Sequence, residues 1–180
     1  DRDIVALYSL FQATPLILIS TKKSQINNVK DFENKRVMTT IDDSSEVSLK
    51  AMMISRKVKI EDLKFIKHSH NIDDLINNKT DVISAYISKA PFELNKKNIQ
   101  YNIFDPKKFG FDMYSDMLYT SENLISSDLN TVLLFKKASL KGWEYAFSNI
   151  EESSEFLYKN KNSQKLLVEE LIYEGKELKK

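Results

Sequence analysis

The chain has 180 residues, and its 27 Lys and Arg side chains nearly balance 26 Asp and Glu, which leaves a net charge of +1. No basic stripe with interleaved aromatic residues is present, so this balance argues against a nucleic-acid partner. The absence of cysteine excludes a disulfide framework, a thiolate zinc site and a cysteine nucleophile. The three glycines, Gly110, Gly142 and Gly175, lie too far apart to form a dinucleotide-binding fingerprint or a phosphate-binding P-loop.

The start of the sequence suggests a segment of a longer protein. The chain begins with Asp1-Arg2-Asp3 and carries neither an initiator Met nor an apolar signal region at this end. We therefore expect any targeting signal or membrane anchor to lie outside it. The longest apolar runs, residues 15–19 and 132–135, are far shorter than the ~20 residues of a membrane helix.

Short apolar runs alternate with helical patterns of one to three turns, which predicts an α/β fold with mostly parallel sheets. Pro15 separates the first two β-rich runs, because proline forbids a continuous helix there. Asn28 and Asn71 are expected to cap short helices. In chain order we expect strands at residues 4–11 and 16–21, a short helix after residue 28, a strand at 36–40, a helix at 46–56, a strand at 64–67, a helix at 73–77, a strand at 82–86, a helix at 91–97 and strands at 101–104 and 117–120.

From Asp128 to the end the pattern is helical, and apolar residues such as Val132 and Phe147 lie close to one face. Trp143 lies on this face, so we expect it in the core rather than in a pocket. Gly142 interrupts the same stretch and should weaken the helix by about 1 kcal/mol relative to Ala. We expect close packing to explain this glycine.

A run of N-cap residues, Asp42-Asp43-Ser44-Ser45, precedes the expected helix at residues 46–56. Capping alone is one explanation, because N-caps use Ser and Asp. The other explanation is a binding role, in which backbone N–H groups and the hydroxyls of Ser44 and Ser45 bind an anionic or acceptor group of a ligand. The two aspartates argue against a strongly anionic ligand.

Tyr86 ends a buried strand, the position at which open α/β sheets bind ligands. A buried core tyrosine is the alternative. Residues 7–15 and 109–116 place aromatic rings and short polar side chains between apolar runs, a mixture that suits a pocket for a small polar or heteroaromatic molecule. Asp112 and Asp116 either accept hydrogen bonds from amino groups of such a ligand or cap turns.

His68 and His70 are the only histidines, and in a strand both would face one side, as a metal site requires. They lie in an expected loop, where polar residues are common, so we predict no zinc binding. No Gly-x-Ser-x-Gly elbow accompanies them, which disfavours a hydrolase. We expect no cofactor and no catalytic role for this domain.

Motifs along most of the chain occur in a fixed order: Phe11-Gln12-Ala13-Thr14-Pro15, Ser24-Gln25-Ile26, Phe32 to Val37, Asp81 to Tyr86, Pro91-Phe92, Asp105-Pro106 to Asp116, Leu118-Tyr119-Thr120-Ser121-Glu122 and Lys141-Gly142-Trp143. With these motifs the chain resembles bacterial solute-binding domains of the thiamine-precursor-binding and SsuA-like family, and among them the versions that serve as sensor inputs. One departure is Lys89-Ala90 before Pro91, where the family usually has Asn-Glu. A candidate ligand-binding carboxylate is therefore absent.

The resemblance implies a two-lobed type 2 periplasmic-binding-protein fold that closes around its ligand by a hinge motion. It assigns lobe I to residues 1–21 and 117–180 and lobe II to residues 22–116. Lobe I would be incomplete, since related domains have further strands before the position of Asp1, and self-association or pairing with a partner is expected. The implied ligand contacts are Gln12, Thr14, Asp42, Ser44, Ser45, Tyr86, Asp112, Tyr114 and Asp116.

The leading functional hypothesis is a periplasmic small-molecule-binding domain that is the sensory input of a membrane-anchored signalling protein, such as a histidine kinase of a two-component system. Its ligand would be a thiamine-pyrimidine-like or similar solute. The alternative is a free substrate-binding protein that delivers cargo to an ABC permease. A third hypothesis, an enzyme of thiamine-pyrimidine formation, is disfavoured because such relatives carry a cysteine-rich metal motif and this chain has no cysteine.

Overall fold

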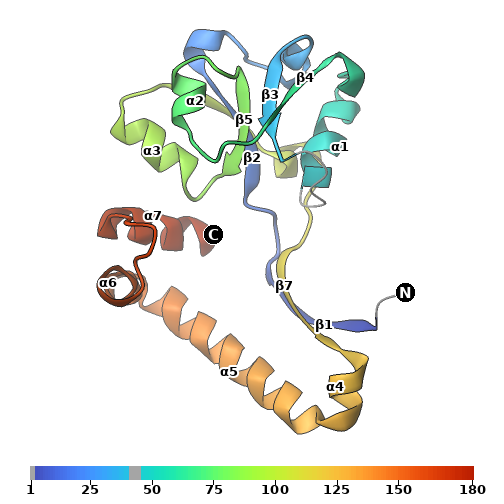
Figure 1. Cartoon of the computed structure of the whole chain (residues 1–180), viewed down its shortest axis with the longest axis vertical. Coiled ribbons are helices and arrows are strands. Elements are labelled where there is room, and N and C mark those ends of the chain that lie inside the picture. Colours follow the sequence, from blue (N-terminus) through green and yellow to red (C-terminus); the bar gives the residue numbers. More distant parts are fainter. Residues whose placement is uncertain (1–2, 41–45) are drawn as a thin grey trace. The chain divides into compact units, whose positions relative to one another are not determined.

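The computed structural model describes residues 3–40 and 46–180 and divides the chain into two compact units. Unit 1 contains Asp1–Gln12 and Tyr114–Lys180, and unit 2 contains Ala13–Met113. Most expected strands and helices are present with nearly the expected bounds (Figure 1). The strands are β1 (Ile4–Phe11), β2 (Leu16–Thr21), β3 (Arg36–Thr39), β4 (Lys64–Lys67), β5 (Val82–Tyr86), β6 (Tyr101–Phe104) and β7 (Ser115–Ser121), and the helices are α1 (Val47–Ser55), α2 (Asp73–Ile76), α3 (Ala90–Lys96), α4 (Glu122–Ser127), α5 (Leu129–Ser148), α6 (Ile150–Asn160) and α7 (Val168–Leu178).

Unit 2 is built on a five-stranded sheet with the order β4-β3-β5-β2-β6. Strand β3 is parallel to β4 and β5, whereas β2 is antiparallel to both β5 and β6. Every strand except β2 therefore runs in the same direction, which confirms the expectation of a mostly parallel sheet. This mixed α/β topology agrees with the fold that the family resemblance implies.

The expected lobe boundaries need a correction at both ends. Strand β2 was assigned to lobe I, but it pairs with β5 and β6 inside the sheet of unit 2. The physical reason is that all six of its residues are buried, so this strand requires neighbours on both edges and cover on both faces. At the other boundary, Tyr114 and the first residues of β7 belong to unit 1 rather than to the unit that contains β5.

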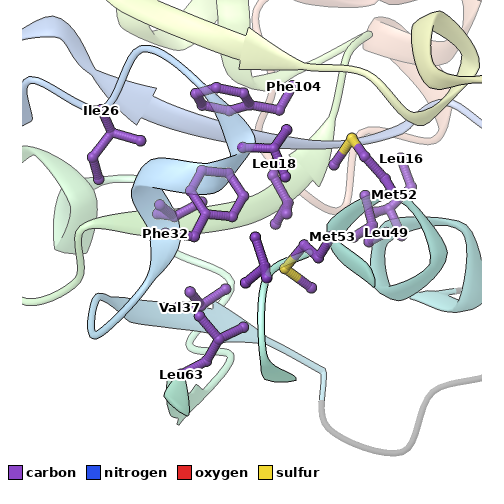
Figure 2. Close-up of a cluster of buried hydrophobic side chains, with 13 residues drawn as sticks. Leu16, Leu18, Ile26, Phe32, Val37, Leu49, Met52, Met53, Leu63 and Phe104 are labelled. Atoms are coloured by element: carbon purple, nitrogen blue, oxygen red, sulfur yellow. The ribbon is translucent and has the colours of Figure 1, made fainter. Parts of the chain in front are cut away.

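Helices cover both faces of the sheet in unit 2 (Figure 1). Alternation along β2 sends Leu16 and Leu18 into one buried cluster, and Ile17 and Ile19 into the other. The first cluster packs against α1, and the second against α2 and α3. Figure 2 shows the first cluster, in which residues of α1 lie on one side and aromatic rings on the other. The rings of Phe32 and Phe104 meet edge to face with centroids 4.9 Å apart.

Arg36 and Asp81 clamp the beginnings of β3 and β5 together. The Arg36 backbone N–H and Nε donate to Asp81 Oδ2 over 2.9 and 3.0 Å, and Nη2 donates to Oδ1 over 2.7 Å. The Arg36 guanidinium holds the pKa of the Asp81 carboxyl below its ordinary value, although partial burial opposes this shift. The clamp sets the register in which Val37 lies opposite Val82.

Unit 1 combines the antiparallel pair β1 and β7 with helices α4 to α7. Trp143 of α5 stacks on Phe147 at 5.6 Å and meets Phe11 of β1 edge to face at 6.4 Å. The Trp143 side chain is still 38% exposed, and Leu129 and Leu133, expected on the same apolar face, are also exposed. The expectation that Trp143 lies in the core is therefore wrong for the described part of unit 1.

The two helical glycines differ in their surroundings. A Cβ added at Gly142 would meet nothing within 4 Å, so close packing does not explain this glycine. At Gly175 of α7, a Cβ would approach Cγ2 of Ile150 to 2.8 Å, which shows that α6 and α7 touch there. No helix in the described part of the chain combines the length and apolar character that crossing a bilayer requires.

Candidate functional site

A cavity of about 310 Å³ lies in unit 2 at the edge of the sheet where β3, β4 and β5 end. The residues that follow or end these strands are Thr40, His68 and Tyr86. Because these strands are parallel, their carboxyl ends meet at one edge, which is where open α/β sheets bind ligands. The lining residues are Leu16, Thr40, Glu46, His68, His70, Asn71, Ile72, Ile83, Ser84, Ala85, Tyr86, Lys89, Ala90 and Glu93.

Strand β2 reaches the same edge from the opposite direction. Its first residue, Leu16, pairs with Tyr86 at the end of β5. Leu16 and Ile83 are buried, as is Ile72 beside α2. These side chains give the cavity an apolar part next to its polar groups.

Glu46 places a buried carboxylate in the cavity. It directly precedes α1, and only 2% of its surface is exposed. Its Oε1 accepts the backbone N–H of Thr40 at 2.9 Å and the hydroxyl of Ser84 at 2.8 Å. Glu46 therefore joins the end of β3 to β5 across the α1 side of the sheet.

His68 is fixed by two hydrogen bonds. Its Nδ1 accepts the backbone N–H of His70 at 2.8 Å, so Nε2 carries the hydrogen and donates it to the Ser84 carbonyl at 2.7 Å. The rings of His68 and His70 stack with centroids 4.5 Å apart and an interplanar angle of 23°. His70 has φ 58°, a left-handed conformation that turns the chain back over His68.

Two buried hydroxyls on the α1 side of the sheet have no hydrogen-bond partner among the described residues. They are Thr39 Oγ1, at the end of β3, and Ser48 Oγ, in the first turn of α1. Thr39 is 2% exposed and Ser48 is 1% exposed. An unpaired buried hydroxyl costs free energy of folding, so this end of the sheet is less well satisfied than the rest of unit 2.

Of the ligand contacts expected from the resemblance, Tyr86 lines the cavity, and it is 55% exposed. The alternative of a buried core tyrosine is therefore wrong. Thr14 and Asp112 belong to unit 2 but do not line the cavity, and Thr14 Oγ1 accepts the N–H of Leu16. Gln12, Tyr114 and Asp116 belong to unit 1, and Asp42, Ser44 and Ser45 lie outside the described residues.

The sequence does not mark most of the polar residues that line the cavity. Ser84 sits in an apolar strand and Glu46 in a helical pattern, so neither position shows a binding role by itself. His68 and His70 were weighed only as a metal pair. A signal was available, because His68 and Tyr86 both follow or end parallel strands, and such residues meet at one edge.

The histidine pair does not have the arrangement of a metal centre. Both nitrogens of His68 already bond to protein groups. The described residues contain no group of three or more His, Asp or Glu side chains placed to hold a metal ion.

Comparisons with solved structures show the fold. The sulfonate-binding protein SsuA of a sulfonate ABC transporter from Methylobacillus flagellatus KT superposes with a TM-score of 0.69 at 12% identity, over 93% of this chain and 50% of that one. The aliphatic sulphonate-binding protein SsuA from Escherichia coli gives 0.67 at 13% identity, over 94% and 54%. The alkanesulfonate-binding protein SsuA from Xanthomonas axonopodis pv. citri, bound to MOPS, gives 0.60 at 9% identity, over 97% and 59%.

The chain thus spans between 50% and 59% of the length of these three proteins and shares their periplasmic solute-binding fold. Comparison with curated protein sequences gave no match. The NMT1/THI5-like family model matches residues 1–153, which is most of the chain. The chain therefore belongs to the NMT1/THI5-like family.

Proposed function

We propose that this chain is the ligand-binding part of an extracytoplasmic solute-binding protein and that its solute is a small polar or heteroaromatic molecule. The observation that carries the proposal is the cavity at the carboxyl ends of β3, β4 and β5, in a fold shared with SsuA-type binding proteins. Its volume of about 310 Å³ fits the small end of ligand pockets. The exposed ring of Tyr86 supplies a face on which a planar ligand can stack.

The full set of ligand contacts is part of this proposal. Tyr86 is its best-supported member because it lines the cavity. We keep the positions carried over from the family resemblance, and we add the cavity residues that the sequence did not mark. The carried-over positions are Gln12, Thr14, Asp42, Ser44, Ser45, Asp112, Tyr114 and Asp116.

A binding role rather than a catalytic one fits the hydrogen bonds in the cavity. The Ser84 hydroxyl donates to Glu46, and His68 bonds to the Ser84 carbonyl rather than to its hydroxyl. Ser84 and His68 therefore do not form the nucleophile and base pair of a hydrolase.

We also propose a membrane partner, for which there are two candidates. An ABC permease is supported by the fold neighbours, one of which is the binding protein of a sulfonate ABC transporter. A membrane-anchored signalling module, such as a histidine kinase, is supported by the sequence resemblance to sensor-type domains. In the sensor role, ligand binding would favour the closed domain and so report the solute to the kinase. Coding sequence that continues past Lys180 into a membrane helix and kinase motifs would decide for the sensor.

Thermal unfolding of the intact domain against a panel of pyrimidines, amino-sulfonates and carboxylates tests the proposed binding. A ligand present at ~100 times its dissociation constant should add about 2.7 kcal/mol to the stability. Tyr86→Ala should remove most of this gain. Tyr119→Ala is the matched control, since Tyr119 is a 65% exposed tyrosine of β7 in unit 1. A stabilising ligand whose effect survives Tyr86→Ala would place the site elsewhere.

A further inference from the structure

The cavity contains a buried carboxylate that is only partly satisfied. Both hydrogen bonds that the described residues make to Glu46 go to Oε1, from Thr40 N–H and Ser84 Oγ. Among the described residues none donates to Oε2, and none forms an ion pair with Glu46. Since Glu46 lines the cavity, a bound molecule that donates to Oε2 would add a hydrogen bond that no described residue makes.

A carboxylate has about four acceptor positions, and a buried charge without a cation is costly. The two donors at Oε1 are an amide and a hydroxyl, and both are neutral. The nearby His68 does not supply a cation to Glu46, because its Nε2–H is directed at the Ser84 carbonyl and its Nδ1 accepts a hydrogen bond. A ligand that brings positive charge to Oε2 would therefore pair with a buried carboxylate that has no cation among the described residues.

The other charged residues of the cavity agree with a cationic guest. Glu93 adds a second carboxylate to the lining, and Lys89 is the only lysine among the described lining residues. Lys89 is exposed, whereas Glu46 is buried. Water screens the exposed charge more strongly than the buried one, so Lys89 offsets the charge of Glu46 only weakly.

We propose that Glu46 determines specificity by accepting an N–H from a positively charged amino group of the solute at Oε2. The inference rests on the proposed function, that this cavity binds the solute, and it adds the class of ligand. The rest of the solute would lie against Tyr86 and the apolar side chains of Leu16, Ile72 and Ile83. A purely anionic solute without an amino group would leave Glu46 unpaired and would be rejected.

The test compares two probes of the same shape, benzylamine and benzyl alcohol, at neutral pH, where benzylamine carries a positive charge. Binding to the intact protein is followed by the backbone amide shifts of Thr40 and Ser84. We expect the wild type to bind benzylamine about tenfold or more tightly than benzyl alcohol, the effect of a hydrogen bond between charged groups. Glu46→Gln should abolish that preference, because Gln keeps an oxygen for both Oε1 bonds but places an NH₂ group at Oε2.

Glu93→Gln is the matched control, since it removes the same charge from the same cavity. It should lower benzylamine affinity less than Glu46→Gln does. Equal losses in the two variants would overturn the assignment to Glu46. Equal affinity of the wild type for both probes would also overturn it, independently of any variant, while leaving the cavity as a solute site. Failure of both probes to shift the cavity amides would overturn the inference, and the solute-binding proposal would then be judged separately by the ligand panel.

Discussion

The clamp between Arg36 and Asp81 offers a sharp test of how the sheet of unit 2 is held in register. Asp81→Asn is the perturbation, because it keeps the size of the side chain and one carbonyl oxygen. The carboxylate now accepts three hydrogen bonds from Arg36, two at Oδ2 and one at Oδ1. Asn places an NH₂ group where one of the oxygens was, so it loses at least one of these bonds and sets two donors against each other.

The magnitude follows from burial. A hydrogen bond to a charged group contributes about 1.5–3 kcal/mol when it is sheltered. The side chains of Arg36 and Asp81 are 38% and 25% exposed, so solvent screening reduces the value toward the lower end. We expect Asp81→Asn to lower the free energy of unfolding by about 1–2 kcal/mol.

The pH dependence of the stability difference between wild type and Asp81→Asn provides an independent test of the clamp. The pKa of Asp81 is lowered in the folded protein by its bonds to Arg36, so this stabilisation is present above the ordinary carboxyl pKa of about 3.9 and is lost as the pH falls through the lower folded value. The difference between wild type and Asp81→Asn should therefore be largest near neutral pH and shrink in acid. Urea unfolding followed by far-ultraviolet circular dichroism measures the stability difference and its change with pH. A difference that is independent of pH, or a variant as stable as the wild type, would refute this account of the clamp.

Three further results are expected. Thr39→Val should stabilise unit 2 by about 1 kcal/mol, because it removes a buried hydroxyl without a described partner, and a loss of melting temperature would show that the hydroxyl is bonded after all. Gly142→Ala should stabilise the protein by about 0.5–1 kcal/mol through helix propensity, whereas Gly175→Ala should destabilise it by about 1–3 kcal/mol through a clash of the added Cβ with Ile150. Thermal unfolding measures both changes, and the opposite order of stability would contradict the packing of α6 on α7. The isolated chain should self-associate, because α5 exposes Leu134 and Phe135 and the described β1–β7 sheet has only two strands. Sedimentation as a monomer at high concentration, without binding of an apolar dye, would contradict this expectation of self-association.

Much of unit 2 could be predicted from sequence because its strands are short, apolar and bounded by polar segments. The six buried residues of β2 are as visible in the sequence as in the structure. Their partners are not, because a continuous apolar run is compatible with either lobe. Only the pairing of Leu16 with Tyr86 and of Leu18 with Phe104 reveals that β2 lies between β5 and β6 in the sheet of unit 2.

The helical region after Asp128 shows the opposite case. Its periodicity predicts helices correctly, and the structure contains α5, α6 and α7 there. Periodicity also predicts a buried face, yet Leu133 is 54% exposed. A pattern of apolar residues indicates that a face is suited to burial, but it does not predict which surface covers that face.

The site could be predicted only in part, because its chemistry depends on contacts between distant positions. Tyr86 was identified from its place at the end of a strand, a rule that works from sequence. Glu46 and Ser84 are 38 positions apart, and each looks ordinary alone. Their hydrogen bond exists because the fold brings Glu46, directly before α1, next to Ser84 of β5, which no local pattern encodes.

The distribution of buried polar groups separates the two ends of the sheet in unit 2. Near the amino end of β5 they are fully bonded, as the hydroxyl of Thr80 donates to the carbonyls of both Arg36 and Val82. At the carboxyl end of β3, Thr39 and Ser48 have hydroxyls without a described partner, and Glu46 retains an oxygen without a described donor. Each of the two unpaired hydroxyls costs about 1–3 kcal/mol, so a sequence selected for stability alone would favour apolar side chains there. The concentration of these costs beside the cavity, and their absence at the clamped end, is the pattern expected where binding rather than folding selects the residues.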